Sequence, residues 1–147
     1  MKVVDRDITT ITEGIIAHQV NCTNHIGSGV AKALIAKWPI VKSSYHAWCD
    51  IYKMEDRLKT IQLIDVAENI YVANCFSQFD KGYDGKLYTD YSAIETCFKT
   101  LNQMNKTVFM TQIYIPFNYG CGLGNGDWNI VSEIIDTHCP GVIACRI

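Results

Sequence analysis

Short apolar runs alternate along this chain with stretches in which apolar residues recur every three or four positions. The short runs, at residues 3–4, 14–20, 61–66, 70–75, 108–115 and 142–147, predict β-strands. Only residues 67–69 separate two of these runs, so strands 61–66 and 70–75 are expected to pair as an antiparallel hairpin.

The stretches with helical spacing predict four helices between the other strands. The first begins at Val30 and ends near Trp38, and the second carries an apolar stripe over residues 41–52. The third spans 91–104, and the last begins after Asp127, which is expected to be its N-cap. This alternation predicts an α/β protein, a three-layer α/β/α sandwich with a mixed central sheet, in a single domain over residues 1–147.

Composition narrows the class of protein. Hydrophobic residues make up 48% of the chain and charged residues 19%, as in an ordinary globular domain. The net charge of −2 argues against a broad basic face for duplex nucleic acid, and no apolar run approaches the roughly 20 residues of a membrane span. Seven cysteines, an odd number found mostly in apolar segments, and an N-terminus without the apolar core of a signal peptide lead us to expect reduced thiols and a cytoplasmic location. The oligomeric state stays open.

Two glycine-rich turns stand between a predicted strand and a predicted helix. Residues 119–128 contain four of the ten glycines, and residues 21–31 contain Gly27 and Gly29. Glycine lets the backbone approach a ligand closely, and the free N–H groups of such turns attract anions. In α/β sheets ligands bind at the carboxyl ends of the strands. The pattern therefore predicts that both turns bind one ligand, with a diphosphate as the expected group.

The same residues carry a resemblance to a known family, the macro domains, which are α/β/α modules that bind ADP-ribose. The matching motifs are Asp7-Ile8-Thr9, Asn21-x-x-Asn24 with Gly27-x-Gly29-Val30-Ala31, and Gly120-Cys121-Gly122-Leu123. The resemblance extends over essentially the whole chain. It is greatest to the small free-standing branch that includes ADP-ribose-1″-phosphate phosphatases, through Phe76-Ser77-Gln78, the segment 88–94 and the segment 120–128.

The resemblance implies a role for each matching position. Asp7 would accept a hydrogen bond from the adenine amino group, and the N–H of Ile8 would contact the adenine ring. Asn24 would contact the distal ribose, and Asn21 would orient the loop. Apart from the resemblance, Asp127 is the only carboxylate beside the second glycine-rich turn and is therefore a candidate for polarising a water. The ligand-binding positions around the two phosphates would be Gly27, Ser28, Gly29, Val30 and Ala31 for one phosphate and Tyr119, Gly120, Cys121, Gly122, Leu123 and Gly124 for the other.

The implied activity is hydrolysis of ADP-ribose-1″-phosphate to ADP-ribose and phosphate, without a metal or other cofactor. Two alternatives remain: a binder of ADP-ribose without catalysis, and a hydrolase of ADP-ribosyl esters on protein. A related branch, which cleaves the glycosidic bond, uses a lysine and an aspartate. Their positions correspond to Gln78 and Gly124 here, so a covalent lysine intermediate is not expected.

Plainer interpretations compete with these roles. Asn21 and Asn24 are also typical of Asx-turns, Asp127 of a helix N-cap, and Cys121 of a small residue in a tight space. The pairs Cys22-x-x-His25 and His46-x-x-Cys49 have zinc-like spacing. Zinc is disfavoured because the first pair falls in the glycine turn and the second in a helical stripe.

Overall fold

The computed structural model describes residues 1–147 and contains one six-stranded sheet. Its strands lie in the order β1-β6-β5-β2-β4-β3. All neighbouring strands are parallel except β3 and β4, which form the predicted antiparallel hairpin. The strands are β1 (Lys2–Asp5), β2 (Gly14–Asn21), β3 (Ile61–Ala67), β4 (Ile70–Gln78), β5 (Ile113–Pro116) and β6 (Ile143–Arg146).

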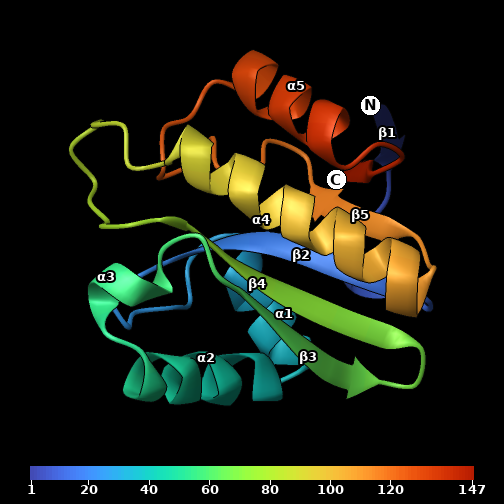
Figure 1. The fold of residues 1–147 in the computed structure, drawn as a ribbon, viewed down its shortest axis with the longest axis horizontal. Coiled ribbons are helices and arrows are strands. Elements are labelled where there is room, and N and C mark those ends of the chain that lie inside the picture. The colour runs from blue at the N-terminus through green and yellow to red at the C-terminus, as the bar shows by residue number, and fades with distance from the viewer.

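Helices cover both faces of this sheet, as Figure 1 shows. Helices α1 (Val30–Lys37) and α2 (Ile40–Ile51) lie on one face, and α4 (Tyr91–Met104) and α5 (Trp128–His138) lie on the other. The predicted three-layer α/β/α sandwich with a mixed sheet is thus confirmed. Three short helical elements were not predicted: a 3-10 turn, η1 (Ile8–Thr10), the helix α3 (Met54–Arg57), and a π-helical turn after α4.

The helix starts follow local side-chain chemistry. Asp90 accepts a hydrogen bond from the N–H of Ala93 at 2.9 Å, and Asp127 accepts one from the N–H of Asn129 at 2.8 Å. A side-chain acceptor at the N-cap satisfies one of the free N–H groups of the first turn. The predicted N-cap role of Asp127 is therefore confirmed.

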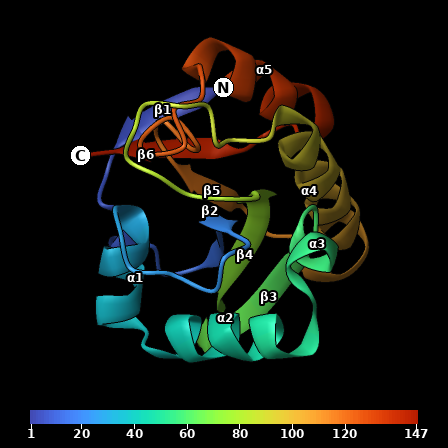
Figure 2. The ribbon, with the colours of Figure 1, turned by 90° about the vertical axis from the view of Figure 1, so that its left-hand side faces the viewer.

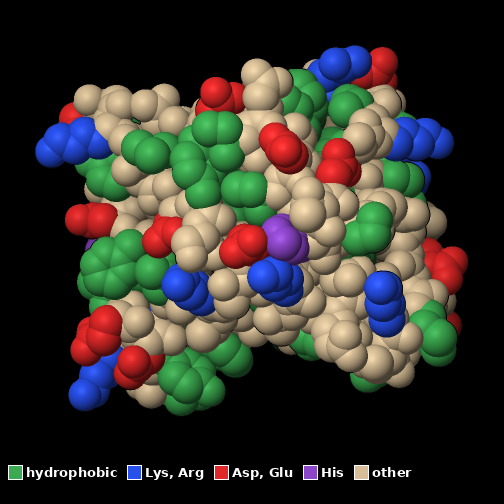
Figure 3. Space-filling model, turned by 45° about the horizontal axis from the view of Figure 1, so that its top comes forward, with side chains coloured by type: hydrophobic (Ala, Val, Ile, Leu, Met, Phe, Trp, Pro, Cys, Tyr) green, Lys and Arg blue, Asp and Glu red, His purple; other side chains and the backbone are tan.

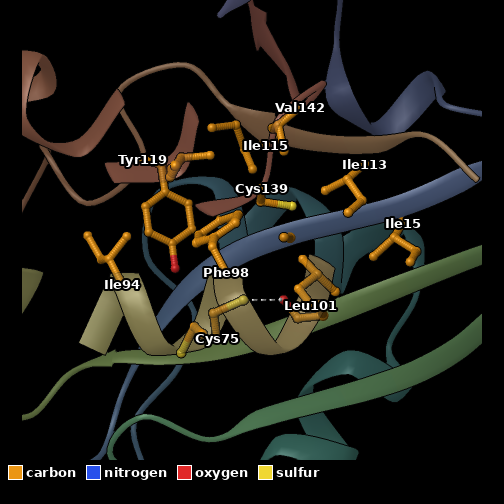
Figure 4. Close-up of a cluster of buried hydrophobic side chains, with 14 of the residues drawn as sticks. Ile15, Cys75, Ile94, Phe98, Leu101, Ile113, Ile115, Tyr119, Cys139 and Val142 are labelled. Atoms are coloured by element: carbon orange, nitrogen blue, oxygen red, sulfur yellow. Dashed lines mark hydrogen bonds between the residues drawn. The ribbon is translucent and has the colours of Figure 1, made fainter. Parts of the chain in front are cut away.

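Alternating residues of the central strand β2 enter the cores on the two faces of the sheet. Ile15 and Ala17 pack in the larger core under α4 and α5, whereas Ile16 packs in a second core under α1. Figure 4 shows the larger core, in which the rings of Phe98 and Tyr119 meet edge to face with centroids 5.4 Å apart. Burial on both faces is typical of a parallel sheet and explains the nearly continuous apolar runs of β2 and β4.

The predicted strand at residues 108–115 is wrong in its first half. After α4 the chain continues as a π-helical turn, η2 (Asn105–Phe109), and the strand begins only at Ile113. Asn105 holds this turn, because its amide donates to the Thr111 carbonyl and accepts from the Thr111 N–H. Val108 and Met110 are exposed, so the apolar run here did not signal a buried strand.

A row of buried polar side chains crosses the sheet from β2 to α2. His18 Nε2 lies 2.5 Å from Asn74 Oδ1, Asn74 donates to Gln62, and Gln62 donates to the Ser44 carbonyl. Because the Asn74 amide nitrogen already donates to Gln62, its oxygen accepts from His18 Nε2–H. The other ring nitrogen of His18, Nδ1, has no partner. Burial lowers the pKa of His18 to about 4, so the ring is neutral at pH 7.

The topology places the two glycine-rich turns side by side. Strands β2 and β5 are parallel neighbours, so their carboxyl ends meet at one edge of the sheet. The turn after β2 and the turn after β5 both start there, as the end-on view in Figure 2 shows. No helix of the structure has the length and apolar character needed to cross a membrane.

Candidate functional site

A cavity of about 560 Å³ lies between the two glycine-rich turns. We call the turn after β2, residues 22–29, the first loop and the turn after β5, residues 117–127, the second loop. The cavity is bounded by residues of both loops, of the strand ends and of the segment after β4: Gln19, Val20, Asn21, His25, Ile26, Gly27, Ser28, Gly29, Val30, Ala31, Gln78, Lys81, Gly82, Tyr83, Pro116, Phe117, Asn118, Tyr119, Gly120, Gly122, Leu123 and Gly124.

The first loop keeps its shape through the side chain of Asn21. Its amide oxygen accepts from the N–H and the hydroxyl of Thr23, at 2.9 and 2.7 Å, and its amide nitrogen donates to the His25 carbonyl at 2.9 Å. Both ends of the Asn21 amide are therefore used within the loop. The Asx-turn considered for Asn21 is present, and Asn21 also lines the cavity.

The two glycines of this loop stand at positions that favour glycine. Gly27 has a φ of 137° and Gly29 a φ of 58°, and open space surrounds the point where a Cβ would lie at each. Gly29 precedes the first turn of α1, and no side chain caps that helix. The N–H groups at the start of α1 are thus free of a capping side chain beside the cavity, an arrangement that favours an anion.

His25 and Asn24 occupy adjacent positions but face different surroundings. His25 lines the cavity, and its Nδ1 lies 2.9 Å from the Thr23 carbonyl oxygen. A carbonyl only accepts, so Nδ1 carries the proton and Nε2 of the neutral ring carries the lone pair. Asn24 does not line the cavity; its amide oxygen lies 2.7 Å from His46 Nδ1, and its φ is 66°.

The base of the first loop is fixed by Arg57 of α3. Its guanidinium donates to the Cys22 carbonyl at 2.6 Å and to the Cys49 carbonyl at 2.7 Å. The first contact holds the start of the loop, and the second satisfies a carbonyl of the last turn of α2, which has no helical partner. Arg57 therefore connects the first loop to α2.

A polar network under the second loop fixes that loop to the sheet. Ser77 donates to Gln19 at 2.8 Å, Gln19 donates to Thr89 at 2.9 Å, and Thr89 donates to the Gly120 carbonyl at 2.5 Å. Tyr119 shares a 2.7 Å hydrogen bond with Ser77, and burial keeps the pKa of Tyr119 well above its usual value. The phenol is therefore neutral, and the network fixes the position of the second loop without adding a charge beneath it.

The glycines of the second loop serve two different purposes. A Cβ on Gly124 would overlap Thr89 Oγ1, so this glycine allows the loop to pack directly on the network. Gly122 instead has open space where a Cβ would lie, and it lines the cavity. Gly124 is needed for packing, whereas Gly122 leaves room for a ligand.

Charge within the cavity is sparse. Lys81 is the only lysine, arginine, aspartate or glutamate among the lining residues. On the face formed by α4 and α5, Figure 3 shows acidic and basic side chains interspersed, with no broad basic region. The recognition of an anion in the cavity would thus rely on N–H groups of the two loops and on one cation.

The zinc-like cysteines lie in an apolar environment. Cys22 and Cys49 pack in one cluster with Tyr45 and Phe76, and burial raises the pKa of Cys22 to about 12. No group of three or more His, Cys, Asp or Glu side chains is placed to hold a metal ion. All seven cysteines are free.

Eleven of the predicted site residues line the cavity. They are Asn21, Gly27, Ser28, Gly29, Val30, Ala31, Tyr119, Gly120, Gly122, Leu123 and Gly124. Both glycine-rich turns thus meet at one cavity, as their sequence pattern indicates.

The other five, Asp7, Ile8, Asn24, Cys121 and Asp127, lie outside the lining. Asp7 caps η1 through hydrogen bonds from the N–H and hydroxyl of Thr9, which lower the pKa of Asp7. Burial and the charge of Asp127 raise the pKa of the Cys121 thiol to about 11, which does not favour a nucleophile. Ligand roles for these five residues, as for the eleven that line the cavity, remain predictions.

Sequence reasoning missed part of the site. Gln19 comes from the interior of β2, whereas Gln78 is the last residue of β4 and was considered only as the position of the related branch's lysine. Both line the cavity because β2 pairs with β4. Lys81 and Tyr83 come from a segment without a motif. His25 was weighed only as a zinc ligand. An available signal was the position of His25 inside the first loop, one residue after Asn24.

Comparison with known proteins identifies a relative at the level of sequence. An uncharacterized 17.5 kDa protein in the tk–vs intergenic region of Enterobacteria phage T4 is 32% identical over 128 residues, which cover 84% of this chain and 78% of the phage protein. No family model matches the sequence.

Solved structures share the fold. A protein of unknown function from Bacteroides thetaiotaomicron superposes with a TM-score of 0.88 at 26% identity, covering 99% of this chain and 97% of that one. A macrodomain protein from Streptomyces coelicolor does so with a TM-score of 0.78 at 22% identity, covering 99% and 97%. Thermosipho africanus DarTG, solved in complex with ADP-ribose, gives a TM-score of 0.78 at 19% identity, covering 99% of this chain and 41% of that one. The chain therefore belongs to the family of the phage T4 protein and has the macro domain fold.

Proposed function

We propose that this protein binds ADP-ribose in the cavity between the two loops and hydrolyses ADP-ribose-1″-phosphate to ADP-ribose and phosphate. The observation that carries the proposal is the meeting of two glycine-rich loops at the carboxyl ends of parallel neighbouring strands, around a cavity of about 560 Å³. That volume is in the range of about 300–1,000 Å³ that ligand pockets occupy. The ADP-ribose complex of the structurally similar Thermosipho africanus protein supports the choice of ligand.

Two features favour phosphate transfer over cleavage of a glycosidic bond. Cleavage of the glycosidic bond in the related branch uses a lysine and an aspartate, and Gln78 and Gly124 occupy those positions here. Hydrolysis of a phosphate ester relies mainly on positioning and on neutral or cationic donors around the phosphoryl oxygens. The open N–H groups beside Gly29 and the space at Gly122 fit this requirement.

In this proposal His25 accepts the proton of the attacking water. Its Nε2 carries the lone pair because Nδ1 donates to the Thr23 carbonyl, and Asn21 fixes Thr23 and the His25 carbonyl. In the proposed step a water oxygen attacks phosphorus while His25 Nε2 takes its proton. The bond from phosphorus to the ribose oxygen breaks, phosphate leaves, and the proton passes to that ribose oxygen. Asn21 then acts as a positioning residue.

The test is incubation of the protein with ADP-ribose-1″-phosphate and, separately, with a protein carrying an ester-linked ADP-ribose. We expect phosphate from the first substrate and no release from the second. His25→Gln is expected to lower the rate, whereas His138→Gln, at a histidine of α5 that contacts Glu95 and lies outside the cavity lining, serves as its matched control.

Three other results would each lead to a different conclusion about the function. Binding of ADP-ribose without phosphate release would make the protein a binder, and release of ADP-ribose from the ester would make it an ester hydrolase. Absence of binding to either ligand would contradict the ADP-ribose assignment itself.

A further inference from the structure

The segment that joins β4 to α4 forms a third wall of the cavity. We call residues 79–88 the strap. Figure 2 shows it crossing the end of the sheet at which both loops begin. The Phe79 carbonyl accepts from the Cys22 N–H in the first loop at 3.1 Å, and the Gly85 carbonyl accepts from the Asn125 amide in the second loop at 2.5 Å. The Tyr88 N–H also donates to the Gly124 carbonyl at 2.9 Å, so the strap is bonded to both loops.

Hydrogen bonds fix the strap on both sides of Lys81. The Asp80 carboxylate accepts from the Lys81 N–H at 2.7 Å, and the Gln78 amide donates to the Asp80 carbonyl at 2.9 Å. Further along, a Cβ on Gly82 would overlap the Tyr88 hydroxyl, which donates to Asp84 at 2.8 Å. The backbone at Lys81 is therefore held beside the cavity, while its long side chain keeps freedom to reach a ligand.

The ammonium group of Lys81 has no ionic partner. No carboxylate lies within 4.0 Å of it, and no carboxylate lines the cavity. Lys86 of the same strap differs on both points, because it pairs with Asp84 at 3.6 Å and lies outside the cavity lining. An unpaired cation beside a cavity bounded by neutral donors attracts anions, and it favours the ligand with the greater negative charge.

We propose that Lys81 determines specificity for charge, so that the site prefers a ligand bearing a third anionic group to ADP-ribose itself. This inference rests on the proposed function, because it assumes that the two loops hold the diphosphate. Backbone N–H groups of the loops contact the two phosphates shared by both ligands. Lys81 adds an attraction that grows with each further charge, which is the difference between ADP-ribose-1″-phosphate and ADP-ribose.

The test compares Lys81→Gln with the matched control Lys86→Gln on two ligands. Initial rates of phosphate release give kcat and KM for ADP-ribose-1″-phosphate, and calorimetry gives Kd for ADP-ribose. We expect Lys81→Gln to raise KM by about tenfold, with a smaller loss of ADP-ribose affinity, as for the removal of one charge-assisted hydrogen bond. The value of kcat should stay within about twofold, since the contact exists before and during the reaction. Lys86→Gln should change neither the KM for ADP-ribose-1″-phosphate nor the Kd for ADP-ribose.

The outcomes separate this inference from the proposed function. Equal losses for both ligands, or no change in Lys81→Gln, would overturn charge selection even if the protein is a phosphatase. A borohydride-stable adduct of ADP-ribose on Lys81 would also overturn it, because the lysine would then be a nucleophile. If the wild-type protein releases no phosphate, the proposed function fails, and calorimetry with both ligands on the two variants still decides whether Lys81 selects charge.

Discussion

Replacing Gly122 by glutamate places a negative charge at the wall of the cavity without disturbing the fold. Gly122 is exposed, its φ lies outside the left-handed region, and no atom lies within 4 Å of the point where its Cβ would stand. Neither backbone strain nor a clash is therefore expected. The variant should unfold at the same temperature as the wild-type protein. Any loss of binding can then be attributed to repulsion or exclusion of the ligand and not to unfolding.

The size of the effect follows from Coulomb repulsion. Two unit charges about 6 Å apart repel by roughly 3 kcal/mol at an effective dielectric constant near 20. The diphosphate carries two charges, but solvent and salt at this exposed position reduce the repulsion. We expect a net loss of about 2–3 kcal/mol, or about 30- to 160-fold in Kd for ADP-ribose.

Calorimetry on the wild-type protein, Gly122→Gln and Gly122→Glu separates the effect of the added charge from the effect of side-chain size. Gly122→Gln has nearly the same volume as Gly122→Glu and no charge, so it measures exclusion of the ligand by the side chain alone. The additional loss in Gly122→Glu should shrink as salt rises from about 0.05 to 0.5 M, since screening acts on exposed charges. If both variants bind ADP-ribose equally at low salt, the phosphates do not lie at Gly122 and our placement of the ligand is incorrect.

Three further predictions concern other positions. Asn24→Gly removes the side-chain amide and keeps the positive φ of 66°, which alanine would strain. We expect the rate of phosphate release to fall by a larger factor than the affinity for ADP-ribose. Turnover at the wild-type rate would mean that Asn24 only shapes the turn. Gly124→Ala should lower the free energy of unfolding by about 1–3 kcal/mol through overlap with Thr89, measured in urea against Gly122→Ala, which has open space; equal stability would refute the packing argument. His18, with a pKa near 4 in the fold and an ordinary pKa near 6.5 when unfolded, takes up a proton more readily in the unfolded chain. Stability should thus fall by about 2–3 kcal/mol as pH decreases from 6.5 to 4.5, and an equally steep fall in His18→Gln would contradict this.

The sequence by itself determined the local elements and the position of the two loops. The spacing of apolar residues in 91–104 and 128–138 predicted α4 and α5, and the three-residue gap at 67–69 predicted the β3–β4 hairpin. Such signals are local, because helix periodicity, N-caps and glycine turns act over a few residues. The same locality explains the failure at 108–112, where an apolar run predicted a strand but Asn105 closes a π-helical turn.

Only the tertiary structure decided which side chains share the cavity. Gln19 and Lys81 are far apart in sequence, and they meet because β2 pairs with β4 and the strap bonds to both loops. The fold also turned Asn24 toward His46, and it left Asp127, the N-cap of α5, outside the cavity lining. Strand order and the course of a connecting segment depend on contacts between residues distant along the chain. Sequence motifs depend on residues that are close together in the chain, and for this reason they identified the two loops. The strap could be assigned to the cavity only from the tertiary structure.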